Sequence, residues 1–138
     1  MKITMKSFLD GVQNQKLAKA VIKQIGGWEE FKANAKSVSE NGIDGGFHGF
    51  VYYKDTVDFA EKNWDEIEKI AQTIADDLGE DSIYSMFASF RCMNGLRTGQ
   101  IVNAIFKKDN EDHEHVMNCL AWFVGEEVCR WYADMEGN

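Results

Sequence analysis

His48 is the residue best suited to acid–base chemistry, and it lies in the segment 44–54, which reads DGGFHGFVYYK. Histidine ionises near neutral pH and can act as a general acid or base. Asp44, Asp55 and Tyr52 lie close to it in sequence, but no nucleophile accompanies them. A catalytic centre needs a nucleophile, a base and an orienting group in defined geometry. The segment therefore favours a hydrogen-bonded structural histidine, and a small hydrolase or modifying enzyme that uses the His48 region is the alternative.

The glycines of this segment do not form a phosphate-binding motif, because neither GxGxxG nor GxxxxGK[ST] is present. Glycine instead allows a tight connection that the surrounding aromatic side chains anchor on helices. Adjacent Tyr52 and Tyr53 cannot both point inward if the chain is extended. We therefore expect at least one of the two tyrosines, Tyr52 or Tyr53, or else His48, to be available for contact with a partner.

The segment 110–119, NEDHEHVMNC, raises the question of a metal site. His115 and Cys119 are four residues apart and would share one helical face, with Glu111 one turn earlier. The pattern is not HExxH, and the sequence nominates no further ligand. A solvated, acidic helix start is the favoured interpretation, with no metal and no cofactor.

Three cysteines, Cys92, Cys119 and Cys129, give an odd count without CxxC spacing. Neither a disulfide framework nor a zinc ribbon is indicated. Their apolar neighbours predict buried, reduced thiols.

Acidic residues outnumber basic ones by 23 to 15, which gives a net charge of -8. This balance argues against direct nucleic-acid binding, which needs a basic face. One acidic group gathers around a predicted helix end and comprises Asp76, Asp77, Glu80 and Asp81. A second spans residues 109–114. Such groups could occupy the basic groove of a nucleic-acid-handling enzyme, and a solvated face is the alternative.

Helices must position these residues, because proline is absent and apolar residues recur at helical spacing. We expect helices over residues 14–25, 28–41, 55–59, 64–78, 82–93, 98–108 and 111–135. The expected helix caps are Asn14, Asp55 or Thr56, Asn63, and Asp81 or Ser82. Short β-like runs at 2–8 and 50–53 leave room for one hairpin. The fold class is mainly α: a single compact domain over residues 1–138, with about six or seven helices and at most a minor β-hairpin.

Neither end of the chain reads as a targeting signal, and no apolar run reaches the length of a membrane span. A cytoplasmic protein that does not contact membranes is expected. The last helix carries Trp122, Trp131 and Tyr132 at different angles and could form a subunit interface, so a homodimer or a homo-oligomeric structural role stays open.

Two segments resemble a family of small uncharacterised proteins encoded by bacteriophages and mobile elements: NGIDGGFHGFVYYKDTV at 41–57 and LAWFVGEEVCRWY at 120–132. The resemblance covers about residues 26–133. It implies a setting inside a host bacterium, and the family has no assigned activity or catalytic residues to carry over to this chain. Small acidic phage proteins often block a host protein, including CRISPR nucleases and restriction enzymes. For this chain, such a role is an inference by analogy.

We therefore expect an interaction protein rather than an enzyme. Its partner would be a host protein with a basic surface, such as a CRISPR or restriction nuclease. Asp76, Asp77, Glu80 and Asp81 would supply the charge, and the Tyr52 region would supply anchor contacts.

Overall fold

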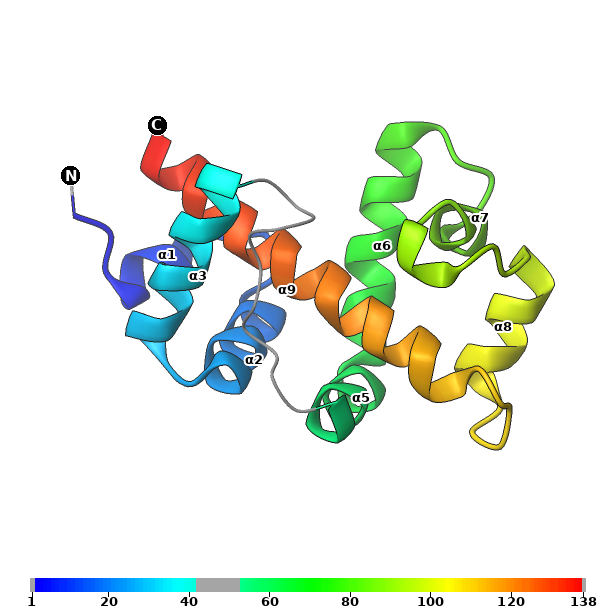
Figure 1. The fold of residues 1–138 in the computed structure, drawn as a ribbon. Helices are drawn as coiled ribbons and strands as arrows, with labels where there is room; N and C mark the ends of the chain where they lie inside the picture. Colours follow the sequence, from blue (N-terminus) through cyan, green and yellow to red (C-terminus); the bar gives the residue numbers. More distant parts are fainter. Residues whose placement is uncertain (1, 42–52, 138) are drawn as a thin grey trace. The chain divides into compact units, whose positions relative to one another are not determined.

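The computed structural model describes residues 2–41 and 53–137, and these residues form a mainly α structure without strands (Figure 1). Eight α-helices and one 3-10 helix, η1, lie in these ranges. Their bounds are α1 Met5–Gly11, α2 Gln15–Ile25, α3 Trp28–Asn41, α5 Tyr53–Lys62, α6 Trp64–Leu78, α7 Ile83–Ala88, η1 Arg91–Met93, α8 Thr98–Phe106 and α9 His113–Gly137. The mainly α fold class is confirmed, with more helices than the six or seven expected.

The described residues group into two compact units. The first contains the described residues of 1–52 and 122–138, and the second contains residues 53–121. The single domain expected over residues 1–138 stays a prediction. No described helix is both long enough and apolar enough to cross a membrane.

The first unit begins with a helix where a short strand was possible. Thr4 and Ser7 form a reciprocal capping box, in which each side chain accepts a hydrogen bond from the other residue's backbone N–H. This arrangement satisfies two backbone donors at the start of a helix. Residues 2–8, for which the sequence left a short strand possible, do not form one, because the cap commits the chain to α1.

Helices α2 and α3 confirm the predicted pair at 14–25 and 28–41. The Asn14 side chain accepts from the Leu17 backbone N–H at 2.9 Å, which is a standard helix cap. Gly26 ends α2 with a φ of +119°, in the left-handed region that glycine occupies without strain.

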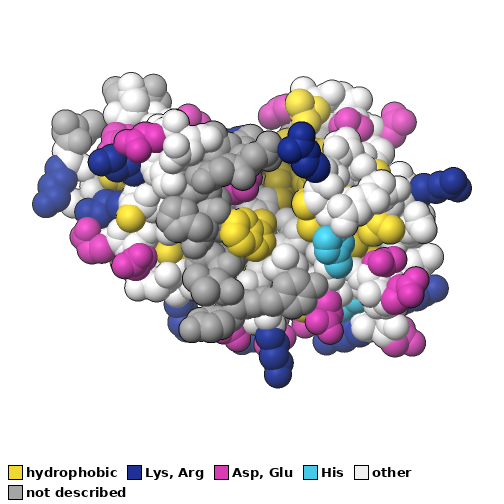
Figure 2. All heavy atoms as spheres, in the orientation of Figure 1, with side chains coloured by type: hydrophobic (Ala, Val, Ile, Leu, Met, Phe, Trp, Pro, Cys, Tyr) yellow, Lys and Arg dark blue, Asp and Glu magenta, His cyan; other side chains and the backbone are white. Residues whose placement is uncertain are grey.

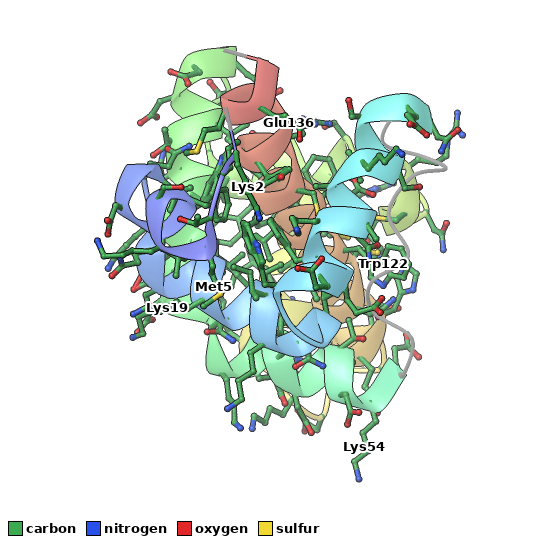
Figure 3. The ribbon with its side chains drawn as sticks, turned by 90° about the vertical axis from the view of Figure 1, so that its left-hand side faces the viewer. Lys2, Met5, Lys19, Lys54, Trp122 and Glu136 are labelled. Carbon is green, nitrogen blue, oxygen red and sulfur yellow. The ribbon has the colours of Figure 1, made fainter. Side chains whose placement is uncertain are left out.

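Aromatic rings form the centre of the first unit. Phe8, Trp28, Phe31 and Tyr132 all contact one another, with ring centroids 5.3 to 5.9 Å apart. Figure 3 shows why these contacts are possible, because the C-terminal turns of α9 lie between α1 and α3. Tyr132 and Trp131 are buried. They are therefore not available as the subunit interface considered for the last helix.

In the second unit, α6 confirms the helix predicted at 64–78. Its buried stripe consists of Ile67, Ile70, Ala71 and Ala75. Asn63 precedes the helix as expected, but its amide donates back to the Phe59 carbonyl at 2.8 Å and makes no cap to α6. Asp55 and Thr56 are not caps either, because α5 already begins at Tyr53.

The helix predicted over residues 82–93 is broken into two pieces. Ser82 caps α7 as expected, through a capping box with Ser85. The helix ends at Ala88, where the Ser89 hydroxyl donates to the Met86 carbonyl at 2.6 Å. Such a bond competes with continuation of the helix. The chain then forms η1, and Asn94 closes it with a φ of +54°.

Candidate functional site

The C-terminal end of α6 collects the acidic group predicted to bind a partner. Asp76 and Asp77 lie in its last turn, Gly79 ends the helix with a φ of +73°, and Glu80 and Asp81 follow before α7. We call these four carboxylates, together with Leu78, the acidic tip. The C-terminal end of a helix carries partial negative charge, so these carboxylates sit where the helix dipole disfavours them.

Hydrogen bonds hold two of the four carboxylates in place. Asp76 Oδ1 accepts from Gln72 Nε2 at 2.9 Å, and Glu80 Oε2 accepts from the Ser85 hydroxyl at 3.2 Å. No lysine, arginine or histidine of the described ranges forms an ion pair with any of the four. Among the residues that the structure describes, no ion pair therefore compensates their negative charge.

Leu78 stands among these charges with 66% of its surface exposed. The sequence places it on the apolar stripe of α6, but Ala75 is the last buried residue of that stripe. Because the helix ends at Leu78, no further turn packs over it. Figure 2 shows acidic side chains and an apolar side chain together around the end of α6. An exposed leucine with an acidic border is a combination suited to protein contact.

A shallow groove adjoins the acidic tip between α6 and α7. It has a volume of about 330 Å³ and is lined by Glu68, Lys69, Gln72, Ser82, Ile83 and Tyr84. Burial, and then the charge of Glu68, raise the pKa of Tyr84 above its usual value. Tyr84 therefore stays a neutral hydrogen-bonding phenol across the physiological range.

An aromatic edge continues from the groove. The ring of Phe106 lies 6.2 Å from Tyr84 and 5.7 Å from Trp64, in edge-on geometry. Phe106 is 55% exposed. Because Trp64 begins α6, this exposed aromatic surface lies away from the acidic tip and is a separate apolar feature of the second unit.

His113 forms a buried polar cluster that the sequence interpretation missed. Its Nδ1 lies 2.6 Å from the Ala104 carbonyl, and its Nε2 lies 2.8 Å from Glu61 Oε2. A carbonyl oxygen and a carboxylate both accept hydrogen bonds, so each contact is a hydrogen bond when the ring nitrogen that faces it carries a proton. The hydrogen bond from His113 is the largest cause of a lowered pKa at Glu61, which burial opposes and the charge of Lys108 supports.

A signal for this burial is present in the sequence. His113 is followed at helical spacing by Val116, Met117 and Leu120, all of which are buried. The histidine therefore lies on the apolar face of α9, which could have distinguished it from the exposed Glu114.

A second cluster joins η1 to α9. The backbone oxygen of Cys92 lies 2.6 Å from His115 Nε2 and 3.3 Å from Cys119 Sγ. His115 and Cys119 share a helical face as predicted, with Nε2 and Sγ 3.8 Å apart. Because Nε2–H donates to the carbonyl, it is occupied and cannot serve as a metal ligand in this state. Within the described residues, no group of three or more His, Cys, Asp or Glu side chains is arranged to hold a metal.

The three cysteines differ in their environments. Cys119 and Cys129 are buried as predicted, and burial, with a smaller contribution from Glu126, raises the pKa of Cys129 to about 12. Cys92 is exposed, so the expectation that it is buried is wrong. The reason is its place in the short η1, where Met93 rather than Cys92 fills the core.

The remaining predicted contact residues are not placed. His48 and Tyr52 lie outside the described residues, and so do Asp44 and the glycines of that segment. Tyr53 begins α5, but its side chain is not among those described. The structure therefore groups the four predicted carboxylates with one another and leaves the aromatic segment as a prediction.

Comparison with known proteins gives one result. A family model described as "Domain of unknown function (DUF7222)" matches residues 6–138. No curated protein and no solved structure matches the chain.

Proposed function

We propose that this chain, which belongs to the DUF7222 family of domains of unknown function, is an interaction protein that binds a basic surface of a partner through its acidic tip. The observation that carries the proposal is the set of four carboxylates around the exposed Leu78, without an ion-pair partner in the described ranges.

Charge and apolar surface have separate roles in such a contact. Uncompensated charge of one sign speeds association with an oppositely charged partner and favours the correct orientation. The affinity of an interface depends mainly on a few well-packed side chains near its centre. Leu78 lies between the carboxylates in sequence and is the exposed apolar residue of the acidic tip. Leu78 would therefore be the anchor, and the carboxylates would form the polar rim around it.

The partner proposed is a nucleic-acid-targeting defence complex of a host bacterium, of the CRISPR or restriction type. Such enzymes bind the phosphate backbone with arginine- and lysine-rich grooves. A chain with a net charge of -8 that presents a compact acidic tip fits such a groove electrostatically. In this proposal the chain is encoded by a phage or mobile element, acts in the host cytoplasm and blocks the groove sterically, without contacting nucleic acid.

The test compares two variants that lose the same charge. The tip variant carries Asp76→Asn, Asp77→Asn, Glu80→Gln and Asp81→Asn. The control variant replaces four exposed acids that lie far apart along the chain, Asp10→Asn, Glu40→Gln, Asp58→Asn and Asp109→Asn. Each is expressed in bacteria that carry one CRISPR or restriction system from a panel, and phage plaques are counted.

The expected result is that the unmodified chain and the control variant restore plaque formation against at least one system, and that the tip variant does not. Purified chain should bind the affected complex less tightly as salt is raised, because surface charge is screened. Equal activity of the two variants would refute the role of the acidic tip. Failure of the unmodified chain against every system in the panel would refute the defence-inhibitor proposal.

A further inference from the structure

We propose that Cys92 and Cys119 are a reversible thiol pair, in which the exposed Cys92 reacts first with a small external disulfide such as glutathione disulfide and Cys119 then closes an intramolecular disulfide. This modification site is separate from the acidic tip. It would tie η1 covalently to α9.

The backbone around the two thiols is already held together. The Cys92 carbonyl oxygen accepts hydrogen bonds from His115 Nε2 at 2.6 Å and from the Cys119 thiol at 3.3 Å. Asn94 Nδ2 lies 3.5 Å from the same His115 nitrogen. A disulfide requires the two Cα atoms to approach within about 7 Å. The Cys119 sulfur contacts the Cys92 backbone oxygen at 3.3 Å and also interacts with the Cys92 side chain, so the two residues are direct neighbours.

Accessibility decides which thiol reacts first. Cys92 is exposed, whereas Cys119 is only 4% exposed. An external disulfide must approach the attacking sulfur in line with its own S–S bond, so a buried thiol is shielded. Cys92 is therefore the entry point and Cys119 the resolving residue.

The electrostatics of Cys119 favour the same order. Its pKa is raised most by a side-chain hydrogen bond with Cys92, next by burial and then by electrostatic interaction with Cys92. These causes keep Cys119 protonated in the reduced pair. Once the Cys92 sulfur is in a mixed disulfide, the two contributions from Cys92 are gone. Cys119 then loses its proton more easily and can attack.

The reaction balances in two exchanges. The Cys92 thiolate attacks one sulfur of glutathione disulfide, forms the mixed disulfide and releases one glutathione thiolate. Cys119 gives its proton to solvent and attacks the Cys92 sulfur, and the second glutathione leaves as a thiolate that takes up a proton. In total the two cysteines are oxidised by two electrons and glutathione disulfide is reduced to two glutathione molecules.

The experiment uses the full-length chain under native conditions. Reduced protein is incubated with glutathione disulfide, remaining thiols are alkylated in denaturant, and peptides are mapped by mass spectrometry. The expected product is a Cys92–Cys119 cross-link with the loss of two hydrogens, and with Cys129 alkylated. Addition of excess reduced glutathione should restore both thiols.

Three variants separate the roles. Cys119→Ser should stop at a glutathione adduct on Cys92, and Cys92→Ser should leave Cys119 unmodified over the same time. Cys129→Ser is the matched control, because it removes a buried thiol that is not part of the pair, and should cross-link like the unmodified chain. Circular dichroism confirms that each variant is folded.

Two outcomes would overturn the proposal. One is accumulation of the glutathione adduct on Cys92 in the unmodified chain, without a cross-link. The other is a cross-link that contains Cys129. The unmodified chain alone decides between these results, so the proposal remains falsifiable if a variant does not fold.

Discussion

Replacement of Glu61 by glutamine tests how much the hydrogen bond between the Glu61 carboxylate and His113 stabilises the fold. We expect Glu61→Gln to lower the free energy of unfolding by about 2 kcal/mol, because a hydrogen bond to a charged partner is worth about 1.5 to 3 kcal/mol. The amide keeps the shape of the side chain and removes its charge. The buried ring, with 5% of its surface exposed, would then lose its bond to a charged acceptor.

Lys108 supplies the matched control. Its Nζ lies 3.6 Å from the same Glu61 oxygen, but the lysine side chain is 81% exposed. Exposed ion pairs contribute little, so Lys108→Gln should cost less than about 0.5 kcal/mol. The contrast between the two variants isolates the buried hydrogen bond at 2.8 Å from the exposed pair at 3.6 Å.

The pH dependence follows from the lowered pKa of Glu61. A carboxyl group whose pKa is lower in the folded than in the unfolded chain stabilises the fold above the unfolded value, which is 4.5 for this group. That contribution is lost as the pH falls through the folded pKa. The difference between the unmodified chain and Glu61→Gln should therefore be complete at about pH 5.5 and shrink below about pH 4.5.

Urea unfolding followed by circular dichroism at these pH values measures the free energies directly. A cost of Glu61→Gln no larger than that of Lys108→Gln would refute the contribution assigned to the hydrogen bond between Glu61 and His113. So would a cost that does not change between about pH 5.5 and about pH 3.5, because it would show that the carboxylate charge plays no part.

The same assay checks two further expectations. Gly79→Ala should lose about 1 kcal/mol because its φ of +73° is strained for alanine, whereas Gly99→Ala should gain about 0.5 kcal/mol because its α8 position has open space. Equal effects would contradict the backbone argument. Phe31→Ala should lose about 4 kcal/mol, because Phe31 is fully buried and contacts three other rings. A loss below about 1 kcal/mol would show that the ring cluster is not the core of its unit.

Local signals in the sequence predicted the helices well. Asn14, Ser82 and the glycines at 26 and 79 act at helix ends as their chemistry requires, because capping depends on residues within one turn. Errors arose where two local signals competed. The weak alternation at residues 2–8 lost to the capping box of Thr4, and the apolar run at 82–93 was broken where the Ser89 hydroxyl donates to the Met86 carbonyl.

The clusters were harder to predict because they join distant parts of the chain. Glu61 and His113 are 52 residues apart, and Cys92 and Cys119 are 27 apart. Helical periodicity shows which face of a helix is buried but not which helix covers it. The sequence could therefore pair His115 with Cys119 on one helix, and only the packing of η1 against α9 adds Cys92.

Two helix ends that are both closed by a left-handed glycine support the proposed role of the acidic tip. Both α2 and α6 end at a glycine in the left-handed region, Gly26 and Gly79. Helix α2 has Lys23 in its last turn, which complements the dipole, whereas α6 has Asp76 and Asp77 there and no basic residue. A negative charge at this position gives up the stabilisation of about 0.3 to 1 kcal/mol that a positive charge would gain from the helix dipole. Folding gains nothing from that arrangement or from an exposed Leu78, whereas a surface that binds a basic partner uses both.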